Sequence, residues 1–363
     1  MISVMATLRQ KIGQVFLVGC RGEALTPEER LTFKQCSFGG FILFGHNCCE
    51  PRQILSLCRS LWQCASAEPP FIAIDQEGGR VHRLPPPFTQ FPAAAAIGAR
   101  NDPNLAYQLG HAAARELAVA GINLNFAPVL DVSSNRQNPI IGDRSFGSDP
   151  NRVVAIGSAW TRGLKAGGVI PCGKHFPGHG DTDKDSHFDL PVVDKAFDAL
   201  MAADLPPFVH ACRNGIESLM TAHVRFTSLD PDWPATLSER VVSGFLRHRL
   251  GYDGVVFSDD MEMKAISDNH GLEDGALLAV RAGVDSLLYC HDLHRAMAAF
   301  EFLCGEAERD PSVRAQLENS YRRIAELKHR RLKGFTGVSD DELTGRLRQS
   351  NHQRLVAEVQ GNL

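Results

Sequence analysis

The stretch NRVVAIGSAWTRGLKAGGVIPCGKH, residues 151–175, shows the pattern that decides the fold. Residues 151–166 have the apolar spacing of a helix, and residues 169–175 form a short apolar run that ends in Lys174 and His175. A short apolar run between helical stretches is typical of a strand that is buried on both faces of a parallel sheet. The stretch therefore predicts a helix followed by a buried strand with a polar end.

The same alternation continues in both directions along the chain. Further apolar runs cover residues 38–45, 71–75, 122–131, 219–223, 254–259 and 284–290, and residues 15–19 are a candidate eighth strand. Further helical stretches cover 104–120, 194–214, 238–250, 276–282 and 294–305. Alternation of this kind implies strand–helix units with right-handed crossovers.

Eight such units close into an α/β fold, a (β/α)8 TIM-type barrel. We predict a single barrel domain over residues 1–335 and a charged, loosely held tail over 336–363. A doubly wound open sheet is the alternative, but no GxGxxG motif follows the first strand.

Composition excludes several classes of protein. The 363 residues include 38 basic and 42 acidic side chains, a net charge of −4, which argues against binding to nucleic acid or to an anionic membrane. No run of roughly 20 apolar residues predicts a membrane span. The ten cysteines include no CxxC pair, and free thiols fit a reducing compartment, although Cys48 and Cys49 could oxidise or bind a metal. We expect a cytoplasmic monomer.

Polar residues end most of the apolar runs. In a barrel these strand ends share one face, where active sites lie. The residues concerned are Asp75, Asp131, Lys174, His175, His223, Asp259 and Asp260. Capping of the following turn could explain any one of them, but not so many together.

Residues 174–191, KHFPGHGDTDKDSHFDLP, predict a long polar loop after the fourth of these runs. Its glycines and prolines exclude a helix. Asp185 lies two residues before His187, and a carboxylate bonded to an imidazole favours its protonated form, as an acid catalyst needs. His175 and His179 could instead bind zinc, but Pro177 and Gly178 break the helix that makes this spacing useful.

The run that ends in FSDD, residues 257–260, places a carboxylate at a strand tip. Such a carboxylate can act as the nucleophile of a double-displacement glycoside hydrolysis. Because neighbouring side chains diverge, we expect one aspartate to face the barrel mouth and the other to cap the next turn. Charged groups elsewhere suit sugar hydroxyls, and these are Asp75, Lys174, Arg83 and Arg144.

Four motifs together resemble family 3 glycoside hydrolases, in the β-N-acetylglucosaminidase branch of bacterial cell-wall recycling. They are IDQEGGRVHR (74–83), IGDRSFG (141–147), GKHFPGHGDTDKDSHFDLP (173–191) and VVFSDDMEM (255–263). The resemblance extends over residues 8–330. His82 and the cysteine-rich start are less typical of that branch.

The resemblance implies a retaining mechanism without a metal or an organic cofactor. It implies that Asp259 is the nucleophile and that His187 is the general acid/base, with Asp185 as its partner. It also implies that Asp75, Arg83, Arg144, Lys174 and His175 bind N-acetylglucosamine. The implied substrate is N-acetylglucosaminyl-1,6-anhydro-N-acetylmuramic acid and its peptides, released from peptidoglycan.

Other functions stay open at this point. A histidine acid/base does not repel anions, so phosphate could replace water, which would make the protein a phosphorylase. A metal-dependent hydrolase, a Schiff-base aldolase using Lys174 and a non-catalytic sugar-binding module are weaker alternatives. The last two leave His187 and Asp259 together without a role.

Overall fold

The computed structural model describes residues 6–65, 68–182, 190–333, 338–347 and 349–361. Eight strands form a closed barrel in the order β1-β10-β9-β7-β5-β4-β3-β2, and every neighbouring pair is parallel. The strands are β1 (Phe16–Gly19), β2 (Gly40–Leu43), β3 (Phe71–Ile74), β4 (Leu124–Asn125), β5 (Ile170–Phe176), β7 (Ser218–Thr221), β9 (Val255–Asp260) and β10 (Ser286–Tyr289). This confirms the predicted (β/α)8 barrel, including the candidate strand at residues 15–19.

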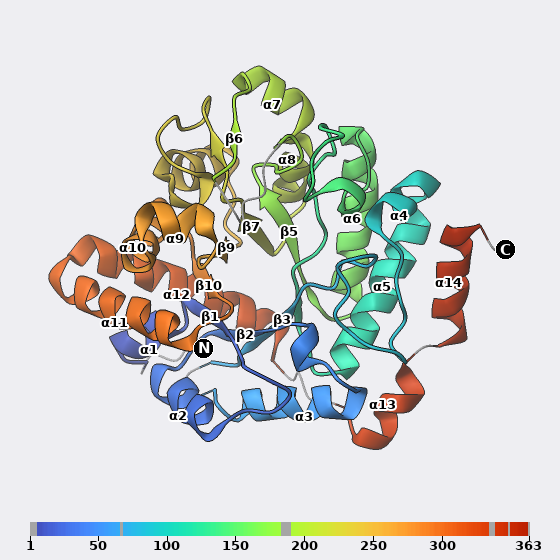
Figure 1. The fold of residues 1–363 in the computed structure, drawn as a ribbon, viewed down its shortest axis with the longest axis horizontal. Coiled ribbons are helices and arrows are strands. Elements are labelled where there is room, and N and C mark those ends of the chain that lie inside the picture. The colour runs from blue at the N-terminus through green and yellow to red at the C-terminus, as the bar shows by residue number, and fades with distance from the viewer. Residues whose placement is uncertain (1–5, 66–67, 183–189, 334–337, 348, 362–363) are drawn as a thin grey trace.

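Helices surround the barrel (Figure 1). They are α1 (Leu8–Gly13), α2 (Pro27–Cys36), α3 (Pro51–Trp62), α4 (Ala94–Arg100), α5 (Pro103–Val119), α6 (Pro150–Ala166), α7 (Phe197–Ala203), α8 (Pro206–Arg213), the π-type helix η4 (Arg240–Arg249), α9 (Lys264–His270), α10 (Leu272–Ala282), α11 (Leu293–Arg309), α12 (Pro311–Arg331), α13 (Asp340–Arg346) and α14 (Ser350–Gln360). Short 3-10 turns are η1 (Gly45–Asn47), η2 (Gly142–Arg144) and η3 (Ala235–Leu237). No helix in the described ranges is long and apolar enough to cross a membrane.

An Asp-Pro pair starts three of the long helices. Asp102, Asp149 and Asp310 precede α5, α6 and α12, and each carboxylate accepts a hydrogen bond from a backbone N–H in the first turn. The proline that follows needs no partner for an N–H and has its φ already set for a helix. These sequence pairs therefore fix where the helices begin.

Apolar side chains fill the barrel interior and close one end of it. Buried residues of the strands and of α12 form a single cluster, which includes Leu17, Phe71, Ile170, Phe257, Ile324 and Leu327. Lys328 of α12 is buried beside them, and its Nζ lies 2.6 Å from both Gln14 Oε1 and the Gly39 carbonyl. Because α12 covers this end, access to the barrel is at the other end, where the strands finish.

Prolines explain two differences from the predicted elements. The helix expected over 194–214 is divided into α7 and α8 at Pro206 and Pro207. The strand expected over 122–131 is regular only in β4, although it stays paired with β5 through hydrogen bonds such as Lys174 N–H to the Pro128 carbonyl, 3.1 Å. Pro128 has no N–H to donate to a strand ladder.

A short pair of strands outside the barrel was not expected. β6 (Val192–Val193) and β8 (Arg225–Phe226) are parallel partners. Two residues per strand are too few to give a recognisable apolar alternation. They join the segment that follows residue 189 to the loop after β7.

The described part of the segment after residue 335 forms two helices. α13 and α14 pack on the barrel helices, with α14 beside α4 and α5 (Figure 1). Leu343, Leu355 and Val359 are buried, and His352 Nδ1 lies 2.8 Å from Glu116 Oε1 of α5. Few residues of this segment are apolar, and those that are buried lie on the side that faces the barrel helices.

Candidate active site

A pocket of about 340 Å³ lies at the end of the barrel where the strands finish. Asp75 follows β3, Lys174 and His175 belong to β5, and Asp259 is the last residue but one of β9. All four line this pocket. The prediction that these strand ends meet at one face is therefore confirmed. Arg83, Arg144 and Asp260 line it as well.

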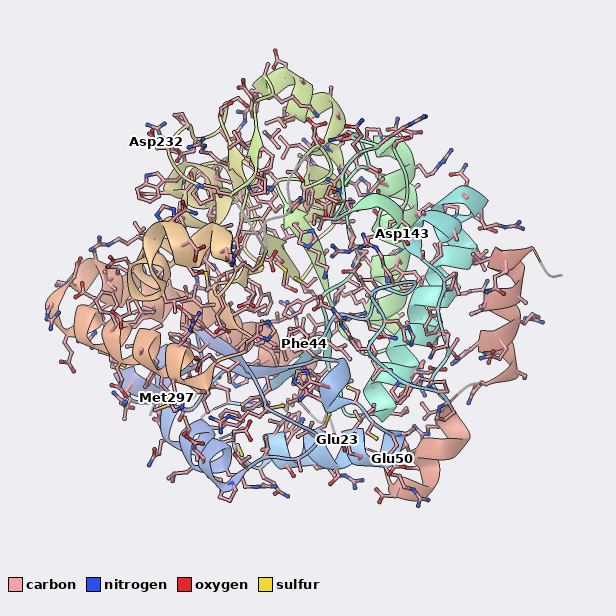
Figure 2. The ribbon with its side chains drawn as sticks, viewed as in Figure 1. Glu23, Phe44, Glu50, Asp143, Asp232 and Met297 are labelled. Carbon is pink, nitrogen blue, oxygen red and sulfur yellow. The ribbon has the colours of Figure 1, made fainter. Side chains whose placement is uncertain are left out.

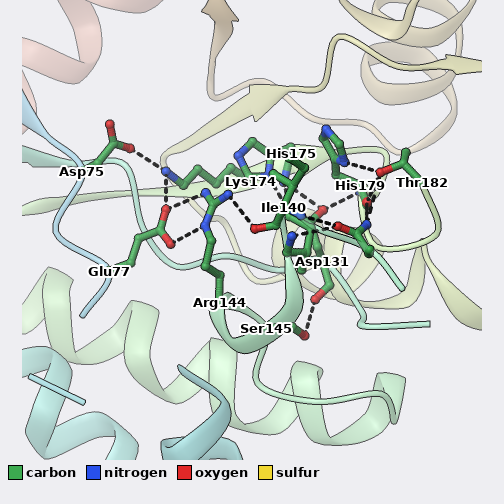
Figure 3. Close-up of polar contacts among 12 residues, drawn as sticks. Asp75, Glu77, Asp131, Ile140, Arg144, Ser145, Lys174, His175, His179 and Thr182 are labelled. Atoms are coloured by element: carbon green, nitrogen blue, oxygen red, sulfur yellow. Dashed lines mark hydrogen bonds and ion pairs between the residues drawn. The ribbon is translucent and has the colours of Figure 1, made fainter. Parts of the chain in front are cut away.

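Two acidic and two basic side chains form a buried ion-pair cluster on one wall (Figure 3). Lys174 Nζ lies 2.5 Å from Asp75 Oδ1 and 2.7 Å from Glu77 Oε1. Arg144 binds Glu77 with two hydrogen bonds of 2.8 Å each, from Nε and Nη2. Bidentate pairing fixes the plane of a guanidinium group. The wall therefore presents charged groups in a set orientation.

The acidic and basic groups of this cluster stabilise one another's charges. Burial opposes the charge of Glu77, but Arg144 and Lys174 outweigh it and hold the pKa of Glu77 well below its usual value. Burial likewise opposes the charge of Lys174, but Asp75 and Glu77 raise its pKa overall. Both groups are therefore charged at neutral pH.

Glu77 is a site residue that the sequence reasoning missed. It lies in the DQEGG segment, and the turn behind it depends on Gly78, whose φ is +98°. A Cβ atom at Gly78 would lie 2.4 Å from the Pro92 carbonyl oxygen, so only glycine fits. The pair of glycines after a strand end was the available signal that the preceding carboxylate turns inward.

Glu77→Gln is expected to lower the free energy of unfolding by about 3 kcal/mol, because it leaves two buried cations with one carboxylate. Asp143→Asn is the matched control, since Asp143 pairs with Arg80 on the surface and is half exposed. An exposed pair contributes at most about 1 kcal/mol. Urea denaturation followed by tryptophan fluorescence measures both. Equal small losses would contradict a structural role for the cluster.

Asp131 lies behind the pocket and orients His175. Its Oδ2 is 2.6 Å from His175 Nδ1, and the backbone N–H groups of His175 and His179 also donate to it. Burial opposes ionisation of Asp131, but His175 and these N–H groups lower its pKa overall. Nδ1 of His175 therefore carries a proton, and Nε2 is the ring atom that remains for a ligand.

His175 and His179 each contact another side chain of the protein through Nδ1. His179 Nδ1 lies 2.9 Å from Thr182 Oγ1, and His175 is bonded to Asp131. Burial, with His175 nearby, lowers the pKa of His179 to about 4, so its ring is neutral. Within the described ranges no group of three or more His, Cys, Asp or Glu side chains could hold a metal ion.

The two neighbouring aspartates of β9 have different surroundings. Asp259 Oδ1 accepts the Asp260 backbone N–H at 2.8 Å. Burial opposes its charge, but His175 and His223 outweigh this and lower its pKa overall, so Asp259 is ionised. Asp260 Oδ1 accepts the Glu262 N–H at 3.1 Å, in the turn after the strand, and burial raises its pKa to about 7. This agrees with the expected capping role, although both side chains reach the pocket.

Arg83 has a free donor in the pocket wall. Its Nε is buried and has no hydrogen-bond partner among the described residues. Its guanidinium lies 5.9 Å from the centre of the Phe44 ring, which also lines the pocket and is labelled in Figure 2. A buried donor without a partner costs about 1–3 kcal/mol. A ligand oxygen would remove this cost.

Asp185 and His187 lie outside the described residues, in the segment between Thr182 and Leu190. His223 is not among the residues that line the pocket, and its ring contacts Thr236 Oγ1 at 2.8 Å and the Asp260 carbonyl at 3.0 Å. It lies close enough to Asp259 to help lower the pKa of that carboxyl group.

Comparisons with known proteins agree on one family. The sequence model of the glycosyl hydrolase family 3 N-terminal domain matches residues 7–327. A β-hexosaminidase from Alkalilimnicola ehrlichii is 39% identical over 282 residues, which cover 76% of this chain and 80% of that protein.

Solved structures give the same result. A family 3 β-N-acetylglucosaminidase from Paenibacillus sp. FPU-7 superposes with a TM-score of 0.93 and 40% identity, over 98% of this chain and 69% of that one. NagZ from Neisseria gonorrhoeae, in complex with N-trifluoroacetyl-D-glucosamine, has a TM-score of 0.77 and 30% identity, over 96% of this chain and 97% of that one.

Proposed function

Because this chain belongs to glycosyl hydrolase family 3, and is therefore a glycoside hydrolase, we propose that its pocket removes terminal N-acetylglucosamine with retention of configuration. The observation that carries the proposal is the position of Asp259. It is an ionised carboxylate at a strand end, in the same pocket as the Asp75–Lys174 pair and the free donor of Arg83. A nucleophile beside sugar-binding groups is what a retaining glycosidase requires.

In the first step Asp259 attacks the anomeric carbon while protonated His187 donates its proton to the glycosidic oxygen. The bond from the anomeric carbon to that oxygen breaks, the leaving group departs as an alcohol, and an ester to Asp259 forms. In the second step neutral His187 takes a proton from water as the water oxygen attacks the anomeric carbon. The ester bond breaks, and the sugar leaves in the β configuration.

The side chains of the buried cluster and of Arg83 and His175 bind the sugar. Asp75 and Lys174 bind neighbouring hydroxyl groups, and Arg83 and Arg144 add donors. His175 contributes Nε2, because Asp131 holds its Nδ1. Charge-assisted hydrogen bonds of this kind are about twice as strong as neutral ones. Glu77 holds Lys174 and Arg144 in place without needing to touch the sugar.

We propose as substrate N-acetylglucosaminyl-1,6-anhydro-N-acetylmuramic acid and its peptides, in the cytoplasm. The sequence motifs and the naming of the related enzymes as β-hexosaminidases and a β-N-acetylglucosaminidase support this choice. All ten cysteines are unpaired thiols, which favours a reducing compartment.

The test is proton NMR of the first-formed sugar from 4-nitrophenyl N-acetyl-β-glucosaminide, with the corresponding β-glucoside alongside. We expect the β-anomer of N-acetylglucosamine to appear first, and the glucoside to react more slowly. The same reaction in phosphate buffer should give no sugar 1-phosphate. An α-anomer would contradict retention, and a sugar 1-phosphate would make the enzyme a phosphorylase.

A further inference from the structure

Gln76 joins the end of β3 to the segment that carries Arg83. It is buried, and its backbone exchanges two hydrogen bonds of 3.0 Å with the side chain of Asn125 at the end of β4. Its side-chain Oε1 accepts the Arg83 backbone N–H at 2.8 Å. Its Nε2 lies 2.9 Å from Nδ1 and 3.2 Å from Nε2 of His82. The side chain thus connects two residues of a pocket wall to the barrel.

These contacts fix the direction of the Gln76 amide. The Arg83 backbone N–H can only donate, so the amide oxygen must face it. The amide nitrogen, which can only donate, then faces the imidazole of His82. Both ring nitrogens lie within reach of this donor, and neutral histidine offers one of them without a proton, as an acceptor. A protonated ring carries a proton on both nitrogens and leaves the Gln76 amide no acceptor.

The charges around His82 act in opposite directions. Burial lowers its pKa, and Arg83 on the same segment does so as well. A hydrogen bond between the ring and the Leu84 backbone raises the pKa, as does Glu116 of α5, but the pKa is lowered overall. That carboxylate already accepts hydrogen bonds from Thr89 and lies 2.8 Å from His352 Nδ1 of α14. His82 is therefore neutral at neutral pH, and acid converts it to the form that opposes Gln76.

We propose that His82 is a positioning residue for substrate binding. Its neutral ring accepts the Gln76 amide, which keeps the Gln76 oxygen on the Arg83 backbone and holds the Arg83 side chain in the pocket wall. The proposal rests on the proposed function, because it assumes that Arg83 binds the sugar. Neither the proposed sugar binding nor the proposed catalysis uses His82, the histidine of RVHR, and this proposal gives it a role.

The test measures KM and kcat separately between pH 5 and 8 for the wild type, His82→Gln and His82→Leu. Glutamine can accept the same hydrogen bond but does not titrate, so it should keep the neutral-pH KM and lose the rise of KM in acid. Leucine should raise KM roughly fivefold at every pH, as expected for one lost hydrogen bond, with little change in kcat. The proposal would be overturned if KM rose in acid equally in the wild type and in His82→Gln. It would also be overturned if His82→Leu had the KM of the wild type.

His46→Gln is the matched control. His46 is an exposed histidine near the same rim, stacked on Phe44, and it has no contact with Gln76. This variant should keep the rise of KM in acid. If it abolished the rise while His82→Gln did not, His46 would be the titrating group and the proposal would fail.

A second readout needs no substrate and so separates this proposal from the proposed function. Nitrogen-15 NMR of the imidazoles, assigned by comparison with His82→Gln, should show a neutral His82 at pH 7. Its titration midpoint should lie below the value of about 6.5 that is usual for histidine. A His82 that is charged at pH 7 would overturn the proposal even if the enzyme cleaves the glycoside as proposed.

Discussion

Asp259→Ala is expected to lower kcat/KM for N-acetyl-β-glucosaminides on the order of 10⁴-fold or more, the scale seen when a covalent nucleophile is removed. Alanine leaves no group to form the glycosyl ester. A water molecule that attacks the anomeric carbon from the same side has no base there to activate it. Steady-state rates with 4-nitrophenyl N-acetyl-β-glucosaminide measure the loss. Circular dichroism checks that the barrel still forms.

Asp260→Asn is the matched control for this prediction. Asp260 is the next residue and also reaches the pocket, but its Oδ1 accepts the Glu262 backbone N–H in the following turn. Asparagine keeps an oxygen for that bond, so this variant should keep most of its turnover. Azide should rescue Asp259→Ala by forming an α-glycosyl azide in the vacated space. An Asp259→Ala enzyme with ordinary turnover would remove Asp259 from the role of nucleophile.

His187→Ala is expected to slow substrates with poor leaving groups by roughly 10²–10⁴-fold, the usual contribution of general acid–base help. Leaving groups that depart without a proton should be affected far less in the first step. A series of aryl N-acetyl-β-glucosaminides with leaving groups of different pKa, compared with a natural disaccharide, measures the dependence. The slope of log kcat/KM against leaving-group pKa should become steeper in the variant.

Asp185→Asn tests the partner of that histidine. It should steepen the same plot, but less than His187→Ala, because an amide can still accept a hydrogen bond without favouring the protonated ring. Asp194→Asn is a control from the same part of the chain, since Asp194 bonds Thr227 on the surface. Equal losses for good and poor leaving groups in His187→Ala would exclude His187 as the general acid.

The barrel could be predicted from sequence because buried parallel strands are short and continuously apolar. Each predicted run overlaps with a strand of the barrel, even the irregular one that ends at Asp131. The α13 and α14 packing could not be predicted in the same way. Only a few buried residues such as Leu355 and His352 hold α14 on the barrel, and one of these contacts is polar.

The site was predictable to the extent that each residue ends a strand. Asp75, Lys174 and Asp259 meet in one pocket for that reason. Glu77 and Gln76 were missed because their roles depend on the turn at Gly78, which returns the chain toward β3. Asp131 also ends its run, yet it lies behind His175 rather than in the pocket lining.

The central claim is that Asp259 becomes covalently attached to the sugar. A 5-fluoro-N-acetylglucosaminyl fluoride, which forms such an ester quickly and hydrolyses slowly, tests this directly by mass spectrometry of the peptides from the treated enzyme. We predict one adduct, on Asp259, in the wild type and none in Asp259→Ala. An adduct on a different residue would contradict the account. So would an unlabelled Asp259 in an enzyme that turns over the natural substrate fully and releases the α-anomer.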